Sequence, residues 1–154
     1  ISTVMKKSLI ISVLILFSSL SGFAQLFSGC ENVSAFNKNR KPDMGIVISS
    51  GEAETVWNAL RLGVAAESKG DSVVVFVLSK AVDVFIKDAA RGKNDSTKFD
   101  IRKASIDFLS NGGDIYTCAT CAKMRNTENV EMCTITSIFD LYGIIKQSKK
   151  TVYF

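Results

Sequence analysis

Residues 72–78 read SVVVFVL, a short run in which every residue after the first is β-branched, aromatic or leucine. Such a run favours a β-strand, and it has no polar face to turn toward water. A strand of this kind must be covered on both sides, as in a parallel sheet between two layers of helices. A similar run, GIVIS, occupies residues 45–49. The two runs predict a buried parallel sheet.

The segments between and after these runs carry apolar residues at helical spacing. After Gly51, with Ser50 as the predicted N-cap, one helical face is formed by Ala53, Val56, Trp57, Leu60 and Val64. Further helices are predicted over 81–86, from about 101 to 110, over 119–125, and after the N-cap Ser137. Further strands are predicted at 114–117, 132–134 and 151–154, and an exposed loop at 88–98. Alternating strands and helices indicate an α/β sandwich with a mostly parallel sheet.

The first part of the chain has the composition of a secretory signal. Met5 precedes the basic pair Lys6 and Lys7, an apolar stretch from 9 to 20, and small residues before Gln25. We therefore expect translation to start at Met5 and residues 1–25 to be a signal peptide. Residues 26–43 are expected to be a linker or N-terminal arm, and 44–154 the folded domain. The apolar stretch is shorter than the roughly 20 residues of a spanning helix, so export is favoured over a retained anchor.

A second processing signal overlaps the linker. Residues 27–30 read FSGC and resemble the motif in which a bacterial cysteine becomes lipidated. Two destinations are therefore expected, a periplasmic protein or a lipoprotein held to the membrane through Cys30.

Charge and composition exclude several function classes. The formal net charge of +4 falls by two when Lys6 and Lys7 are removed, and no basic run is interleaved with aromatic residues, so no nucleic-acid partner is expected. The sequence contains no histidine, which excludes histidine-based nucleophilic triads. No P-loop is present.

The chemically informative stretch is TCATCAKMRN, residues 117–126. Cys118 follows a predicted strand and precedes a predicted helix, whose free backbone N–H groups would stabilise a thiolate. Arg125 is expected to add positive charge. The catalytic candidates are therefore Cys118, Cys121 and Arg125.

Other interpretations of the Cys-x-x-Cys spacing remain open. A thioredoxin-like site is disfavoured because the single proline, Pro42, lies upstream and Thr117 stands where tryptophan is usual. Dithiol redox chemistry on another fold, or a structural disulfide, is compatible with an exported protein. A zinc site would need four ligands, which here would be Cys118, Cys121, Cys133 and either Cys30 or Glu131.

Residues 45–154 resemble the DsrE/DsrF-like family. The resemblance rests on ISSGEAETVWNALRLGVAA after the first strand, GDSVVVFVLSKAVD, FDIRKASIDFLSNGGDIYTCATCAKMR, and the closing KKTVYF. It implies a flavodoxin-like three-layer α/β sandwich with a mostly parallel five-stranded sheet, assembled as a trimer or hexamer.

The resemblance also implies a function. Cys118 matches the family's cysteine and would carry a persulfide, received from a sulfur donor protein and passed to an acceptor protein. Cys121 would be a resolving or protecting thiol, Arg125 would give electrostatic support, and no cofactor or metal is required. The alternatives are a non-catalytic oligomeric binding protein with a structural CxxC disulfide or metal site, and a dithiol redox protein.

Overall fold

The computed structural model describes residue 36 and residues 41–90 and 99–154, which lie in one compact unit, Val33–Phe154. The predicted signal peptide, the lipidation motif at Cys30 and most of the linker lie outside the described residues. The elements are β1 (Met44–Ile48), α2 (Ala53–Glu67), β2 (Val73–Val77), α3 (Ala81–Ala90), α4 (Ile101–Ser110), β3 (Asp114–Cys118), α5 (Ala119–Lys123), β4 (Thr134–Thr136), α6 (Ile138–Gln147) and β5 (Lys150–Tyr153).

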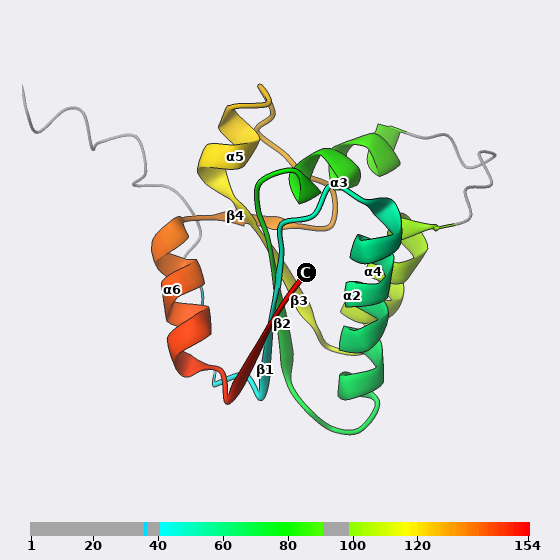
Figure 1. The fold of residues 1–154 in the computed structure, drawn as a ribbon, viewed down its shortest axis with the longest axis vertical. Helices are drawn as coiled ribbons and strands as arrows, with labels where there is room; N and C mark the ends of the chain where they lie inside the picture. Colours follow the sequence, from blue (N-terminus) through cyan, green and yellow to red (C-terminus); the bar gives the residue numbers. More distant parts are fainter. Residues whose placement is uncertain (1–35, 37–40, 91–98) are drawn as a thin grey trace, which may run out of the picture. The chain divides into compact units, whose positions relative to one another are not determined.

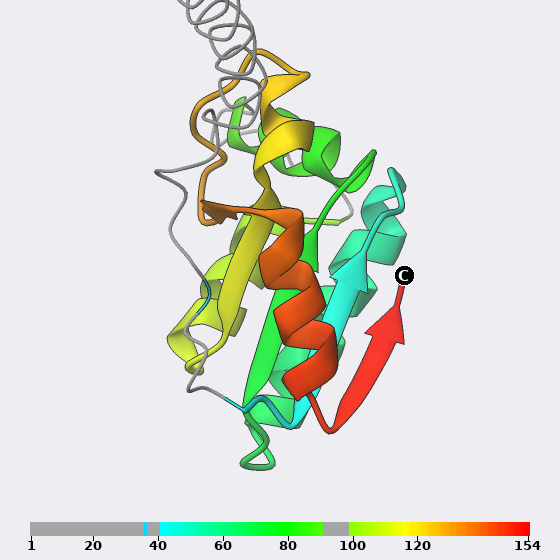
Figure 2. The same ribbon diagram turned by 90° about the vertical axis from the view of Figure 1, so that its left-hand side faces the viewer.

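The five strands form one sheet in the order β4-β3-β2-β1-β5, and every neighbouring pair is parallel. In Figure 1, α2 and α4 cover one face and α6 covers the other, and Figure 2 shows α6 in front of the sheet. The predicted flavodoxin-like three-layer α/β sandwich is confirmed, and its sheet is fully parallel.

The alternating side chains of the central strands build a separate core on each face. Val73, Val75 and Val77 of β2 contribute to the larger core under α2, α3 and α4. Val74 and Phe76 contribute to the smaller core under α6, which also contains Phe36, Val47, Cys118, Leu141 and Ile144. All five residues of β2 are fully buried, as an all-apolar strand in a two-sided sheet requires.

The close packing of α2, α4 and β3 depends on Phe108 and two glycines. The Phe108 ring is fully buried, and a Cβ atom on Gly63 of α2 would lie 2.7 Å from it. A Cβ on Gly113, just before β3, would lie 2.2 Å from the same ring. The two glycines thus leave the space that the ring occupies.

Several element boundaries differ from the sequence predictions. Glu52, not Ser50, is the N-cap of α2, and the Ser50 hydroxyl instead accepts a hydrogen bond from the Glu52 backbone. Helix α3 continues to Ala90, so residues 88–90 of the predicted loop are helical, and residues 91–98 lie outside the described residues. The fourth strand is shifted to 134–136 because Met132, in the left-handed region at φ 63°, turns the chain just before it.

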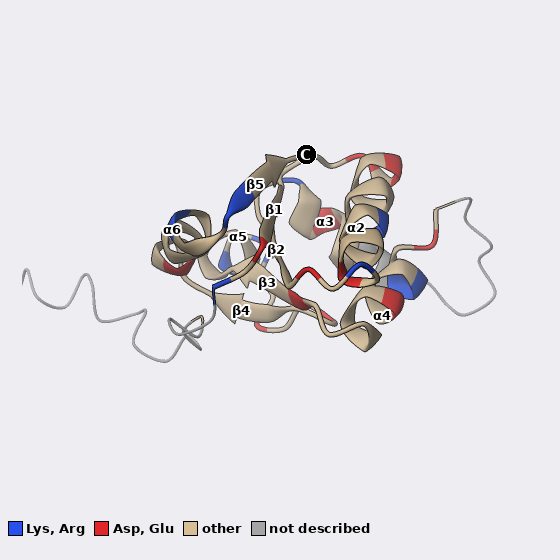
Figure 3. Cartoon of the chain, turned by 90° about the horizontal axis from the view of Figure 1, so that it is seen from below, with Lys and Arg blue, Asp and Glu red and all other residues tan. Residues whose placement is uncertain are grey.

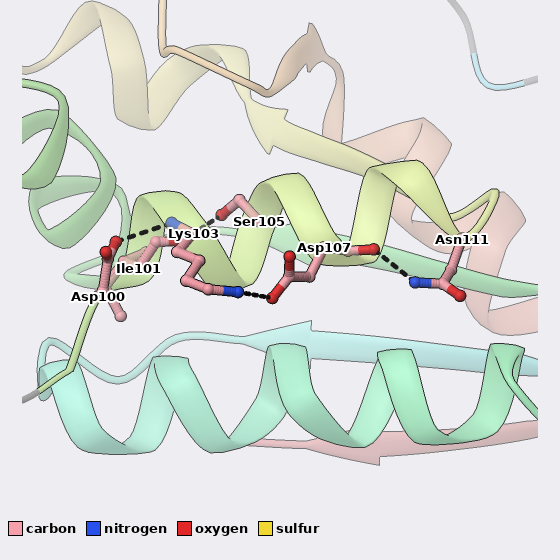
Figure 4. Close-up of polar contacts among 6 residues, drawn as sticks. All are labelled: Asp100, Ile101, Lys103, Ser105, Asp107 and Asn111. Atoms are coloured by element: carbon pink, nitrogen blue, oxygen red, sulfur yellow. Dashed lines mark hydrogen bonds and ion pairs between the residues drawn. The ribbon is translucent and has the colours of Figure 1, made fainter.

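Side chains cap the helices on both faces of the sheet. Asp100 accepts a hydrogen bond from the Lys103 backbone N–H at the start of α4, and Lys103 pairs with Asp107 one turn later (Figure 4). Ser137 caps α6 as predicted, in a capping box with Asp140. Figure 3 shows basic and acidic residues mixed along the helices.

Candidate functional site

The candidate site lies at the carboxyl ends of β2 and β3. Cys118 is the last residue of β3 and the N-cap of α5, as the sequence predicts. Strand β2 is the parallel neighbour of β3, with Val77 opposite Thr117. The residues that follow β2 therefore lie beside the cysteines, where ligands bind in open α/β sheets.

Cys118 is a buried thiol. Its side chain is 5% exposed and belongs to the core under α6. Burial raises the pKa of Cys118, and a hydrogen bond with the Cys121 thiol raises it further, while the backbone N–H groups of Cys121 and Thr120 act in the opposite direction. The lowering expected from a helix N-terminus is therefore outweighed, because the surrounding core desolvates the sulfur and α5 is only five residues long.

Cys121 is half-buried and contacts both cores. Its Sγ accepts a hydrogen bond from the backbone N–H of Ser79, at 3.3 Å. Ser79 follows β2 and has φ 55°, in the left-handed region that few residues other than glycine adopt. The chain thus takes an uncommon turn at the residue that donates to the sulfur.

Arg125 is tied into the site by three hydrogen bonds. Its Nε and one terminal nitrogen donate to the two carboxylate oxygens of Asp83, at 2.7 and 2.8 Å, and the other terminal nitrogen donates to the Cys121 carbonyl at 3.0 Å. The Arg125 side chain is 22% exposed. Asp83 is the main cause of the raised pKa of Arg125, and negative charge on Cys121 or Cys118 adds to it.

The structure brings all three predicted site residues together, and it adds two that the sequence analysis did not identify. Ser79 and Asp83 come from the turn and first helical turn after β2, and they contact Cys121 and Arg125 across 42 positions of sequence. The parallel pairing of β2 with β3 is the feature that indicates these contacts, because the segments that follow neighbouring parallel strands meet at one edge of the sheet.

Cys133 is separate from this pair. It packs against the core under α2 and α4, and burial strongly raises its pKa. The three described cysteines are all free thiols. The described residues contain no group of three or more side chains able to hold a metal ion, so the Cys118, Cys121, Cys133 and Glu131 set is not assembled. Cys30 lies outside the described residues.

Two surface cavities lie beside helices of the domain. One, of about 470 Å³, adjoins α5, and its lining consists of Ala119, Ala122, Lys123, Asn126, Thr127, Glu128 and Ile135. The other, of about 430 Å³, lies between α2 and α4 and includes Trp57, whose ring is covered by the Arg61 guanidinium at 4.3 Å. Neither cavity is lined by a cysteine. No helix of the described part is long and apolar enough to cross a membrane.

Comparisons with known proteins are consistent with this architecture. The structure is similar to the crystal structure of the YchN protein from E. coli, with a TM-score of 0.62 and 19% identity, covering 73% of this chain and 99% of that one. It is also similar to the conserved protein of unknown function BT1422 from Bacteroides thetaiotaomicron, with a TM-score of 0.58 and 14% identity, covering 79% and 100%. None of the curated proteins searched matches the chain. The sequence model of the DsrE/DsrF-like family matches residues 43–154, and the chain therefore belongs to the DsrE/DsrF-like family.

Proposed function

We propose that this protein is a cysteine-based sulfur carrier whose Cys118–Cys121 pair holds a persulfide. The observation that carries the proposal is the arrangement of two neighbouring free thiols, one buried and one half-buried, beside a guanidinium fixed by a carboxylate. Membership of the DsrE/DsrF-like family supports sulfur relay as the general role.

The chemistry of a persulfide suits these surroundings. A persulfide anion carries negative charge on its terminal sulfur, and the Ser79 N–H and the Arg125 guanidinium both favour negative charge nearby. Sulfur transfer between thiols exchanges one sulfur–sulfur bond for another, so it requires a donor persulfide and an acceptor thiol but no cofactor. The proposed partners are therefore a sulfur donor protein and a sulfur acceptor protein.

The proposal includes a location and an assembly. We place the mature protein in the periplasm, or at a membrane through a lipid on Cys30, on the basis of the N-terminal sequence alone. We also propose a homo-oligomer, a trimer or hexamer. Helix α6 supports this, because its side chains Ile138, Phe139 and Tyr142 are 52%, 81% and 65% exposed.

A second candidate function is dithiol redox exchange. It is favoured by the proximity of the Cys118 and Cys121 thiols, which an oxidant would join in a disulfide. In that case the protein would cycle between a dithiol and a disulfide without carrying sulfur. The same proximity is compatible with a disulfide that has only a structural role.

Peptide mass spectrometry of protein isolated from its native cells, with thiols trapped before lysis, tests the proposed function. Trypsin releases Cys118 and Cys121 together in residues 104–123, and Cys133 in residues 126–146. We expect one additional sulfur atom on the first peptide and none on the second, which is an internal control. A first peptide found only as a Cys118–Cys121 disulfide would favour redox or structural roles instead.

A further inference from the structure

We propose that Cys121, and not Cys118, is the thiol that receives sulfur from the donor, and that Cys118 is a buried thiol that supports it. The inference rests on the proposed function and assigns the two roles within it. It reverses the assignment that the family resemblance implies for these positions.

Accessibility is the first observation that separates the two thiols. Cys118 is 5% exposed and is enclosed by apolar side chains of the core under α6. Cys121 lies one helical turn further on and retains partial exposure to solvent. In thiol exchange, the attacking sulfur, the sulfur that it attacks and the leaving sulfur lie nearly in a line. The attacking sulfur therefore needs open space in which the donor can approach. Of the two thiols of the pair, Cys121 is the one that offers such room.

Hydrogen bonding is the second observation. The Ser79 backbone N–H points at Cys121 Sγ and is held there by the left-handed backbone at Ser79. Arg125 donates to the carbonyl oxygen of Cys121 itself, and Asp83 fixes the guanidinium through both of its oxygens. Cys121 is therefore held at both its sulfur, by the Ser79 N–H, and its backbone, by Arg125.

The environment of Cys118 completes the division of roles. Burial raises the pKa of Cys118, and the neighbouring Cys121 thiol raises it further. Cys118 packs in the core under α6 together with Cys121, one helical turn before it. It thereby acts as a positioning residue for the receiving sulfur.

The transfer step balances without an oxidant or a reductant. The Cys121 thiolate attacks the outer sulfur of a donor persulfide, RS–SH, and a bond forms between Cys121 Sγ and that sulfur. The RS–S bond breaks, its electron pair leaves with RS⁻, and RS⁻ takes up the proton that Cys121 released. The products are RSH and a persulfide on Cys121.

The experiment treats the full chain with glutathione persulfide and, separately, with iodoacetamide, both at about pH 8. Fragment ions that break the peptide chain between Cys118 and Cys121 assign the added group in the wild type. The variants Cys121→Ser and Cys118→Ser are compared with Cys133→Ser as the matched control. Thermal melts monitored by circular dichroism check that each variant is folded, and the wild-type assignment needs no variant.

We expect sulfur on Cys121 in the wild type and in Cys118→Ser, and at least about tenfold slower loading of Cys121→Ser, with Cys133→Ser unchanged. Iodoacetamide should modify Cys121 before Cys118. Sulfur on Cys118, with Cys121→Ser loading at the wild-type rate, would overturn the inference and leave the carrier function intact. Absence of sulfur from both would overturn the carrier function. In that case the alkylation order decides the inference, which fails if Cys118 reacts first or at the same rate.

Discussion

At the scale of single residues, Arg125 determines how charge is distributed around the cysteine pair. Negative charge on Cys121 or Cys118 raises the pKa of Arg125, so the guanidinium lies within electrostatic reach of both sulfurs. Asp83 orients the guanidinium and also offsets part of its charge. The site thus contains a cation whose position is fixed and whose charge is partly neutralised by Asp83.

We expect Arg125→Gln to slow alkylation of the cysteine pair by roughly threefold to tenfold near neutral pH, because loss of the cation disfavours the thiolates. Alkylation rates with iodoacetamide, measured as a function of pH, check this. The difference from the wild type should vanish at high pH, where the reacting thiols are ionised in both proteins.

Arg102→Gln is the matched control for that substitution. Arg102 forms an exposed ion pair with Glu131, away from Cys118 and Cys121, and its loss should leave the alkylation rates unchanged. Equal slowing in both variants, or no slowing in Arg125→Gln at any pH, would remove Arg125 from the site.

At the scale of elements, the contact between α2 and α4 depends on the Phe108 ring filling the space left by Gly63 and Gly113. A methyl group at either glycine meets the ring at 2.7 Å or less. Cores packed this closely tolerate added methyl groups poorly, since the ring and the backbone must shift to admit them.

Gly63→Ala should lower the free energy of unfolding by about 1–3 kcal/mol, as measured by urea denaturation. Gly143→Ala, also within a helix, should change it in the opposite direction by about 0.5–1 kcal/mol. A Cβ at Gly143 would meet its nearest neighbour, the Phe36 ring, at an ordinary 3.8 Å, so only the gain in helix propensity remains. A stabilised Gly63→Ala variant would show that α4 can move away from α2 without cost.

The strands and helices were predictable from the sequence because their signals are local. The apolar run at 72–78 and the serine before α6 both specify their elements within a few residues. The Ser79 and Asp83 contacts were not predicted, because they depend on which strands are neighbours and on a left-handed turn at a residue that is not glycine. The burial of Cys118 was missed for a similar reason. It depends on the second core, which Phe36 and α6 complete from distant parts of the chain.

At the scale of the whole molecule, the described helices are divided between the two faces of the sheet. Helices α2 and α4 lie on one face, whereas α6 lies on the other (Figure 1). The outer surface of α6 nevertheless carries the exposed apolar side chains described above. A monomer would leave them in water, which favours an interface between copies of the chain.

Phe139→Ser should reduce the oligomeric mass measured by size-exclusion chromatography with light scattering, with little change in the melting temperature of the fold. The small stability effect is expected because Phe139 is 81% exposed. Ile106→Ser, at an exposed apolar residue of α4, is the control and should leave the mass unchanged. A monomeric wild type, or an unchanged mass for Phe139→Ser, would contradict the proposed role of α6.

The strand order also affects how the protein folds. Strand β1 is first in the chain, yet one of its two partners is β5, and Met44 pairs with Lys150. During synthesis, one side of β1 therefore has no strand to pair with until residues 150–153 have been translated. Contacts between such distant positions slow folding, and an apolar strand with an open edge can pair with other chains in the meantime. Folding speed and aggregation during synthesis should therefore be governed by how soon β5 docks, and not by the strength of the β1–β2 pairing that forms earlier.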